Sequence, residues 1–520
     1  MTDHRAVLAI DLGNGGPKVA VVAVDGTVLA WSAQAVPTVT AADGSSVQDA
    51  RLWYSGIIAA TRDCMVRAGA AVAGSAGSGA PRIIAVGITG QWGSTVPVTA
   101  DGSAAGDVLL WSDTRGRDLV QQVVGGPITV AGYAPHRVLR WIRLTGGGPS
   151  LAGADPTGHS LVLQQQLPDT YARTRWLLEP IDLIGLLLTG EVAATPASMT
   201  LSWLTDNRPG APLRYDDVLV RRSRRDADRL PPLRPTGSVL GGVLPQVAAD
   251  LGITEGVPVV CGIPDLHAAV LGSGTIDDFA SHVTISTTSW LGARVPFKKT
   301  DVLHSIATVP GLDTAHPLVA NNHETAGVAL EWLRGQVLTG STYACLLDEA
   351  AQVDAGAGGV IFTPWLDGER SPVEDKRLRA SFLHMSMRTH RGHLARAVLE
   401  GVAHNARWLM EHYERFLGRP VSSLRILGGG ATSDLWCQIH ADVLQRPMER
   451  VVDPRAAQLR GVALWALVCT GELDLADVPA RVPVDAVFEP DRDAAPVYDR
   501  AYAQFRQLHR TLRPLHHALT

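Results

Sequence analysis

A polar turn near the N-terminus combines residue types that could bind a phosphorylated ligand together with its metal ion. Asp11 ends a buried apolar run, residues 13–16 read Gly-Asn-Gly-Gly, and Lys18 follows them. Glycines let backbone amides approach an anion, a carboxylate is a preferred ligand of hydrated Mg²⁺, and a lysine can face a phosphate. A simple hairpin turn would also need these glycines, so the local sequence leaves both interpretations open. The P-loop pattern and the dinucleotide fingerprint are both absent.

Two later turns also follow predicted strands. Asp265 comes shortly after the strand of residues 257–261 and begins a helix, the usual place for a catalytic group in an α/β domain. An N-cap would explain the same aspartate, and simple packing would explain His267. The run Gly428-Gly429-Gly430-Ala431 joins a strand to a helix, where N-terminal amides favour phosphate. A tight turn without a ligand would use the same glycines.

The elements that must position these turns alternate between strands and helices. Strands are predicted at residues 6–10, 19–24, 82–89, 257–261, 282–286 and 424–427, and helices at residues 49–69, 170–188, 390–417 and 455–469. Each half of the chain opens with a strand, a polar turn and more strands, and later adds strand–turn–helix units. This duplicated layout predicts an α/β fold of two related lobes around a cleft, dividing near residue 276.

The composition fits a globular protein and excludes several functions. The 520 residues are 46% hydrophobic and 19% charged, and 46 basic against 51 acidic side chains give a formal net charge of −5. That balance argues against nucleic acid as the main partner. Five cysteines without a Cys-x-x-Cys pair argue against a disulfide framework or structural zinc. The apolar runs are too short for a membrane span, and we expect a cytoplasmic protein.

These turns, in this order, resemble the FGGY carbohydrate kinase family of the actin-like sugar kinase superfamily. Eight segments between about residues 8 and 466 carry the resemblance: Ala9–Gly13, Gly87–Gln91, Leu110–Arg115, Leu188–Gly190 with Ala197–Ser198, Gly262–Asp265, Pro364–Pro372, Ala397–Gly401 and Gly428–Asp442. Each segment is weakly diagnostic alone, and the order of all eight is strongly diagnostic.

The resemblance implies two RNase H-like (actin-like ATPase) domains facing each other across an active-site cleft. Residues 1–275 would bind the sugar, and residues 276–520 would bind ATP and carry a helical tail. By the same resemblance, Asp265 is the general base, and Asp11 and Asp265 hold Mg²⁺. The sugar would contact Gln91, Trp92, Asp265 and His267. The nucleotide and its phosphates would contact Gly13, Asn14, Lys18, Thr287, Thr288, Ser289, Gly428, Gly429, Gly430 and Ala431.

The chain departs from the family's usual turns at several positions. The hydroxyl residues of the first turn are replaced by residues 14–16, and Thr287 replaces a glycine. Trp92 and Gly93 follow Gln91 where xylulokinases usually have Met-His. We expect an ATP-dependent kinase for a ketopentose, with xylulose as the first choice.

Two alternatives to this expectation stay open. The segment from Asp265 to Ala268 resembles ribulokinases, which keeps a ribulokinase-like or other polyol kinase open. The altered turns keep open a non-catalytic sugar- or nucleotide-binding pseudokinase. The expected partners are a small-molecule sugar or polyol and ATP, in a chain compatible with a homodimer.

Overall fold

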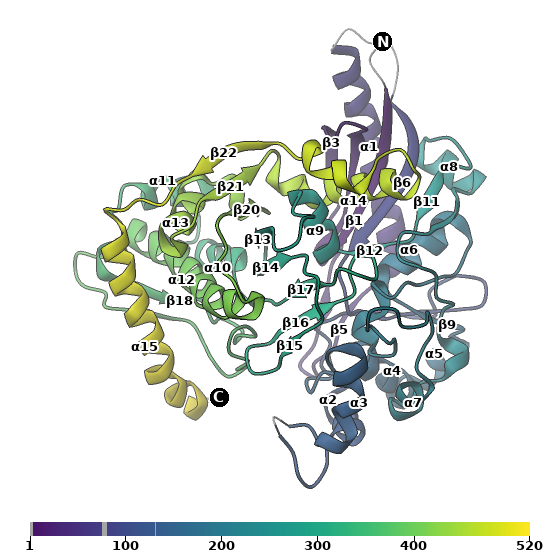
Figure 1. The fold of residues 1–520 in the computed structure, drawn as a ribbon, viewed down its shortest axis with the longest axis horizontal. Coiled ribbons are helices and arrows are strands. Elements are labelled where there is room, and N and C mark those ends of the chain that lie inside the picture. The colour runs from purple at the N-terminus through teal and green to yellow at the C-terminus, as the bar shows by residue number, and fades with distance from the viewer. Residues whose placement is uncertain (1–3, 75–80, 131, 520) are drawn as a thin grey trace.

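Two mixed sheets form the centres of the two halves of the chain (Figure 1). The structure, a computed structural model, describes residues 4–74, 81–130 and 132–519. The first sheet has the order β10-β11-β6-β1-β2-β3, with β12 also paired to β6. Its strands are β1 (Arg5–Gly13), β2 (Gly16–Ala23), β3 (Val28–Ala33), β6 (Arg82–Gly90), β10 (Val239–Gly242), β11 (Pro258–Val260) and β12 (Ile263–Pro264). Because β1, β11 and β12 run parallel to β6, their carboxyl ends point to one edge of the sheet.

The second sheet repeats the central pairing of the first. Its order is β14-β13-β20-β21-β22, made of β13 (Ser281–Ile285), β14 (Ser289–Ala293), β20 (Leu424–Leu427), β21 (Met448–Val451) and β22 (Val484–Phe488). In each sheet the first strand forms an antiparallel hairpin with the next strand and a parallel pair with a much later one. This repetition confirms the predicted α/β fold with two related lobes.

Helices and small sheets surround these two sheets. The helices are α1 (Ala50–Gly74), α2 (Arg117–Val124), α3 (Pro135–Thr145), α4 (Pro156–Gln166), α5 (Pro168–Arg173), α6 (Pro180–Thr189), α7 (Asp217–Arg222), α8 (Pro245–Leu251), α9 (Asp265–Ser273), α10 (Gly327–Trp332), α11 (Tyr343–Ala351), α12 (Arg391–Leu417), α13 (Asp434–Leu444), α14 (Ala457–Cys469) and α15 (Ala495–Leu519). The small sheets contain β4 (Val39–Thr40), β5 (Ser46–Gln48), β7 (Val96–Val98), β8 (Val108–Leu109), β9 (Trp176–Leu178), β15 (Thr300–Asp301), β16 (Ile306–Val309), β17 (Leu318–Ala320), β18 (Ile361–Thr363) and β19 (Ser381–Leu383). Within the described residues, every helix is too short or too polar to cross a membrane.

The helix predicted over residues 170–188 is wrong, whereas α1, α12 and α14 confirm three other predicted helices. The chain instead forms α5, β9 and α6 in this region. Pro180 has no amide hydrogen and cannot continue a helix, but it suits the first turn, where α6 begins. Residues 176–178 satisfy their backbone groups by pairing with β7. Tertiary pairing therefore overrides the helical pattern.

Helices α9 and α14 cross at the junction of the two halves, and glycines make the crossing close. A Cβ atom on Gly461 would lie 2.0 Å from the Ala268 carbonyl oxygen, and one on Gly272 would lie 1.9 Å from the Ala457 carbonyl oxygen. Arg460 of α14 is fully buried, and its Nε donates to the Gly26 carbonyl in the first half at 2.9 Å. These contacts join α14 of the second half to α9 and to the turn between β2 and β3 of the first half.

Candidate active site

The carboxyl ends of β1, β6 and β12 bring the predicted catalytic and sugar-side residues together. Asp11 lies opposite Thr89 in the parallel pairing of β1 with β6. The residue before Asp265 lies opposite Gly90 in the pairing of β12 with β6. Gln91 follows Gly90 directly, so its backbone leaves the sheet between the two aspartates. The register of three strands therefore places Asp11, Gln91 and Asp265 at one edge of the sheet.

Lys18 and Asp11 form an ion pair across the first hairpin. The two residues are opposite each other in β1 and β2, and Lys18 Nζ lies 3.0 Å from Asp11 Oδ2. Asp11 is 3% exposed, while the Lys18 side chain is 39% exposed. The attraction of Asp11 raises the pKa of Lys18, so the ammonium stays charged at neutral pH. Because an ammonium has three donors, Lys18 can bind an anion without leaving Asp11.

Asp265 has the properties of a proton acceptor at neutral pH. It is the first residue of α9, while Pro264 occupies the N-cap position. Its Oδ1 accepts from the amide of the next residue, Leu266, at 2.8 Å. Burial, and then repulsion from Asp11, raises the pKa of Asp265 to about 7. A carboxyl group that titrates near the working pH suits general base catalysis.

Gln91 presents a buried amide whose oxygen and nitrogen differ in their hydrogen bonding. The residue is 6% exposed, and its Oε1 accepts from Ser94 Oγ at 3.3 Å. Its Nε2 has no hydrogen-bond partner among the described residues. An unpaired buried donor costs about 1–3 kcal/mol, so a ligand oxygen at this position would relieve an existing penalty.

Trp92 and His267 lie beside each other and differ in burial, because Trp92 is half-buried and His267 is fully buried. Trp92 Nε1 donates to the Ser198 carbonyl at 3.0 Å, and its ring meets His267 edge-on at a centroid distance of 6.3 Å. His267 is fully buried, and its Nε2 lies 2.8 Å from the Pro310 carbonyl oxygen. Burial lowers the pKa of His267 to about 4, so the ring is neutral. Packing explains much of His267, while Nδ1 still lacks a partner in the described part of the chain.

Glu179 anchors the loop of residues 91–93 through a hydrogen bond, and sequence analysis missed it. Its Oε2 accepts from the Gly93 amide at 3.1 Å, and the side chain is 2% exposed. Asp182, one turn later in α6, is also buried. Burial raises the pKa of Asp182 to about 8, and burial together with Asp182 raises the pKa of Glu179 well above its usual value. The only sequence signal for this pair is two carboxylates beside the apolar run of α6.

The predicted phosphate turns of the second half lie against each other. Thr287 and Thr288 connect β13 to β14, and Ser289 begins β14. Gly428 has φ +96°, and a Cβ atom there would lie 2.4 Å from the Ile285 carbonyl oxygen at the end of β13. Positions 429 and 430 differ: a Cβ atom on Gly430 would meet the Ile285 side chain at 2.4 Å, while one on Gly429 would meet no described atom within 4 Å. Gly428 and Gly430 therefore allow close packing against Ile285, and Gly429 faces open space. Ala431 is buried.

The first turn and the second-half turns are linked through the segment before α14. The Gly428 amide donates to the Pro454 carbonyl at 2.9 Å. The next residue, Arg455, stacks on Trp31 of β3, with the guanidinium carbon 5.3 Å from the ring centroid. Its charge also acts on Lys18. At the first turn itself, the exposed Asn14 accepts from Gln48 Nε2 through its backbone carbonyl, and Gly13 lies beside the Lys18 ammonium.

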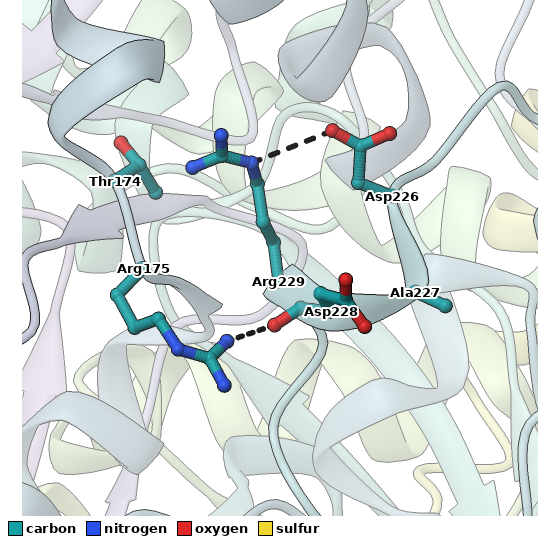
Figure 2. Close-up of a pocket in the computed structure, with 6 residues that line it drawn as sticks. All are labelled: Thr174, Arg175, Asp226, Ala227, Asp228 and Arg229. Carbon is teal, nitrogen blue, oxygen red and sulfur yellow. Dashed lines mark hydrogen bonds and ion pairs between the residues drawn. The ribbon is translucent and has the colours of Figure 1, made fainter.

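A separate hollow of about 520 Å³ contains none of the predicted site residues. It is lined by Thr174, Arg175, Asp226, Ala227, Asp228 and Arg229. Figure 2 shows Arg229 directed at the Asp226 carboxylate, 3.4 Å away, and Arg175 directed at the Asp228 carbonyl. Because its cations are already matched by acceptors, this hollow is not part of the candidate active site.

Two family domains match the sequence. The N-terminal domain of the FGGY family of carbohydrate kinases matches residues 158–272, and the C-terminal domain of that family matches residues 299–469. The chain belongs to the FGGY family of carbohydrate kinases. It is therefore a phosphotransferase with an alcohol group as acceptor, and the kinases of this family act on small-molecule sugars and use ATP.

Relatives and solved structures extend the match over the whole chain. The xylulose kinase of Staphylococcus epidermidis is 25% identical over 520 residues, covering 98% of each chain. The gluconokinase of Bacillus licheniformis is 27% identical over 313 residues, covering 58% of this chain and 60% of its own. The structures of ligand-bound xylulose kinase and of gluconate kinase from Lactobacillus acidophilus each superpose with a TM-score of 0.83 at 19% identity, covering 99% of this chain and 100% of theirs. The fold is thus the actin-like sugar kinase fold that the sequence predicts.

Proposed function

We propose that this kinase transfers the γ-phosphoryl group of ATP to a hydroxyl of a ketopentose, with xylulose as the first candidate. The observation that carries the proposal is the convergence of Asp265, Asp11 and Gln91 at the carboxyl ends of β1, β6 and β12. The end-to-end match with proteins named xylulose kinase supports this substrate class. Among the predicted sugar-side residues, Gln91, Trp92 and His267 are uncharged at neutral pH and Asp265 is acidic, so these residues offer no cation to the carboxylate of gluconate and fit a neutral acceptor better.

In the proposed reaction, Asp265 takes the proton of the acceptor hydroxyl. The freed oxygen forms a bond to the γ-phosphorus as the bond to the β–γ bridging oxygen breaks, and ADP leaves with that oxygen. Gln91 Nε2 donates to a sugar oxygen and so fixes the acceptor beside Asp265. Lys18 and the turn amides at residues 287–289, 429 and 430 hold the phosphates, while the Gly428 amide stays bonded to the Pro454 carbonyl. Such placement and charge compensation are the main needs of phosphoryl transfer.

We also propose Asp11 and Asp265 as the protein ligands of a Mg²⁺ ion. The described residues contain no cluster of three or more His, Cys, Asp or Glu side chains that could hold a metal ion without the nucleotide. Two carboxylates nevertheless fit Mg²⁺, because this ion keeps several waters and takes further ligands from nucleotide phosphates. Asp11 is buried at the strand end with Lys18 as its ion-pair partner. When bound, Mg²⁺ would neutralise charge on the phosphates.

The domain roles follow from the same site. We propose that residues 1–275 bind the sugar and residues 276–520 bind the nucleotide, with α14 packed on the first sheet as a shared element. A cytoplasmic location and a homodimer stay predictions. A ribulokinase-like or other polyol specificity is the second candidate, because Asp265–Ala268 resembles ribulokinases and His267 Nδ1, beside Trp92, has no partner among the described residues.

A coupled ADP-release screen tests the substrate class. The full chain is assayed with Mg²⁺-ATP over xylulose, ribulose, pentitols, glycerol, hexoses and gluconate. We expect the highest kcat/KM with xylulose. A higher kcat/KM with ribulose or a pentitol would move the assignment to the second candidate. A higher kcat/KM with gluconate would contradict the preference for a neutral acceptor. Nucleotide binding without stimulation by any acceptor would favour the pseudokinase.

A further inference from the structure

A hollow formed by α2, α3 and α7 gathers positive charge without matching negative charge. It has a volume of about 320 Å³ and is lined by Gln122, Val123, His136, Arg137, Arg221, Arg222 and Arg224. The lining contains four arginines and no Asp or Glu. In the described ranges, none of these four arginines has a carboxylate within ion-pair distance. Such a cluster is unexpected in a chain with a net charge of −5.

Hydrogen bonds to neutral oxygens hold three of these arginines in place. Arg137 Nη1 donates to the Gln122 carbonyl at 2.9 Å, and Arg222 Nη1 donates to the Arg137 carbonyl at 3.0 Å. Arg224 Nη1 donates to Gln122 Oε1 at 3.1 Å. Each bond uses part of a planar guanidinium that has five N–H donors, so the other donors remain available. The fixed, like-charged groups repel one another, and a bound anion would remove that repulsion.

The neighbouring hollows of the same half are built differently. The hollow of Figure 2 contains Asp226 and Asp228 beside its two arginines. A third hollow, of about 190 Å³, pairs Arg140 with Asp216 and Arg208 with Asp206, each at 2.6 Å. Of these three hollows, the one between α2, α3 and α7 alone lacks a carboxylate. Its uncompensated charge is therefore a local feature rather than a result of the high arginine content of the chain.

We propose that the hollow between α2, α3 and α7 binds the phosphate group of a small phosphorylated metabolite, at a site separate from the active site. Guanidinium groups pair with phosphate through two parallel hydrogen bonds, and several held in one hollow can surround it. A volume of about 320 Å³ is at the lower end for small-molecule sites, which fits a phosphate ester with a short carbon skeleton. In Figure 1 the α2–α3–α7 end lies apart from α9 and β12, which carry the active-site residues.

Isothermal titration calorimetry of the full chain tests the proposal. The protein is first saturated with Mg²⁺ and a non-hydrolysable ATP analogue, so that the phosphate positions of the active site are filled. Inorganic phosphate and 2-phosphoglycolate are then titrated, with glycolate as the unphosphorylated control. We expect both phosphates to bind, glycolate not to bind, and the affinity to fall as salt is raised. No heat of binding at millimolar phosphate would overturn the proposal.

Matched variants locate the bound phosphate. The double variant Arg221→Ala/Arg224→Ala should weaken binding by about tenfold or more, because it removes two charge-assisted donors. Arg214→Ala, an exposed arginine of the third hollow, should bind phosphate like the wild type. Unchanged binding by the double variant, or an equal loss in Arg214→Ala, would contradict the assignment. Should the double variant fail to fold, Gln122→Glu provides the second test: it places a carboxylate beside Arg224 and should abolish phosphate binding, and retained binding would overturn the proposal.

Discussion

The hydrogen bond between Glu179 and the Gly93 amide makes a sharp prediction, because one substitution of Glu179 keeps the acceptor and another removes it. Burial, and then Asp182, raise the pKa of Glu179 well above its usual value, which favours the neutral form of the side chain. Glu179→Gln keeps the shape of the side chain and an oxygen acceptor for the Gly93 amide, and should behave nearly like the wild type. Glu179→Leu keeps the volume but removes the acceptor.

The size of the effect of Glu179→Leu follows from the buried donor that it leaves behind. The Gly93 amide, now 3.1 Å from its acceptor, would lose its partner in a water-excluded position, at a cost of about 1–3 kcal/mol. Gly93 belongs to the loop that carries Gln91 and Trp92. If the loop must be in place to bind the sugar, this cost corresponds to about a 5- to 150-fold higher KM for the sugar.

Initial rates of ADP release, measured over both sugar and ATP concentration, separate this effect from a general loss of structure. We expect Glu179→Leu to raise KM for the sugar while KM for ATP stays unchanged. Urea denaturation of both variants shows how much of the cost falls on folding. Equal damage from Glu179→Gln would refute the argument that the acceptor oxygen is what the loop needs, and an unchanged KM for the sugar in Glu179→Leu would refute the role of Glu179 as the anchor of the loop.

Three further predictions address the phosphate contact of Lys18, the buried carboxyl of Asp182 and the packing of α9 against α14 at Gly461. Lys18→Ala should raise KM for ATP with little change for the sugar, and an unchanged KM for ATP would exclude a phosphate contact. Asp182→Asn should gain stability over the wild type as pH rises from about 4 to 8, by up to about 1.4 kcal/mol per pH unit. The folded wild-type carboxyl keeps its proton up to about 8 and the unfolded one loses it near 3.8, so rising pH destabilises only the wild type. The same difference in urea midpoint between the two proteins at pH 5 and at pH 8 would contradict this. Gly461→Ala should lower the unfolding free energy by about 1–3 kcal/mol or more, because its Cβ would lie 2.0 Å from the Ala268 carbonyl oxygen. The control is Gly69→Ala in α1, where the added Cβ would meet no described atom within 4 Å. This variant should raise the unfolding free energy by about 0.5–1 kcal/mol. A lower unfolding free energy for Gly69→Ala would refute the packing argument.

The parts of the site that follow directly from strand ends could be predicted from the sequence. Asp11 and Gln91 each follow a long apolar run, and runs of that kind form the parallel strands β1 and β6. Parallel strands end at one edge of a sheet, so residues far apart in the chain meet there without any knowledge of side-chain contacts. The same logic brings the turn after β13 and the turn after β20 to one edge of the second sheet, because β13 and β20 form its parallel pair.

The parts that depend on tertiary contacts could not be predicted. Glu179 acts through a hydrogen bond to a residue 86 positions away, and a pattern of hydrophobicity contains no information on that contact. The ion pair of Lys18 with Asp11 has no signal in the sequence either. The same holds for the close contacts of Gly428 and Gly430 with Ile285. Arg224 likewise donates to Gln122 of α2, a residue 102 positions away, and the sequence contains no signal for that contact.

Sugar-dependent ADP release by Asp265→Asn is the most direct test of the proposed mechanism. Asparagine keeps the shape of the side chain and can still accept from the Leu266 amide, so the variant should fold and bind nucleotide like the wild type. It cannot take the proton of the acceptor hydroxyl. We predict that kcat falls by about 10²- to 10⁴-fold, the usual contribution of a general base. Turnover close to that of the wild type, in a folded variant that binds nucleotide, would contradict the role of Asp265 as the base.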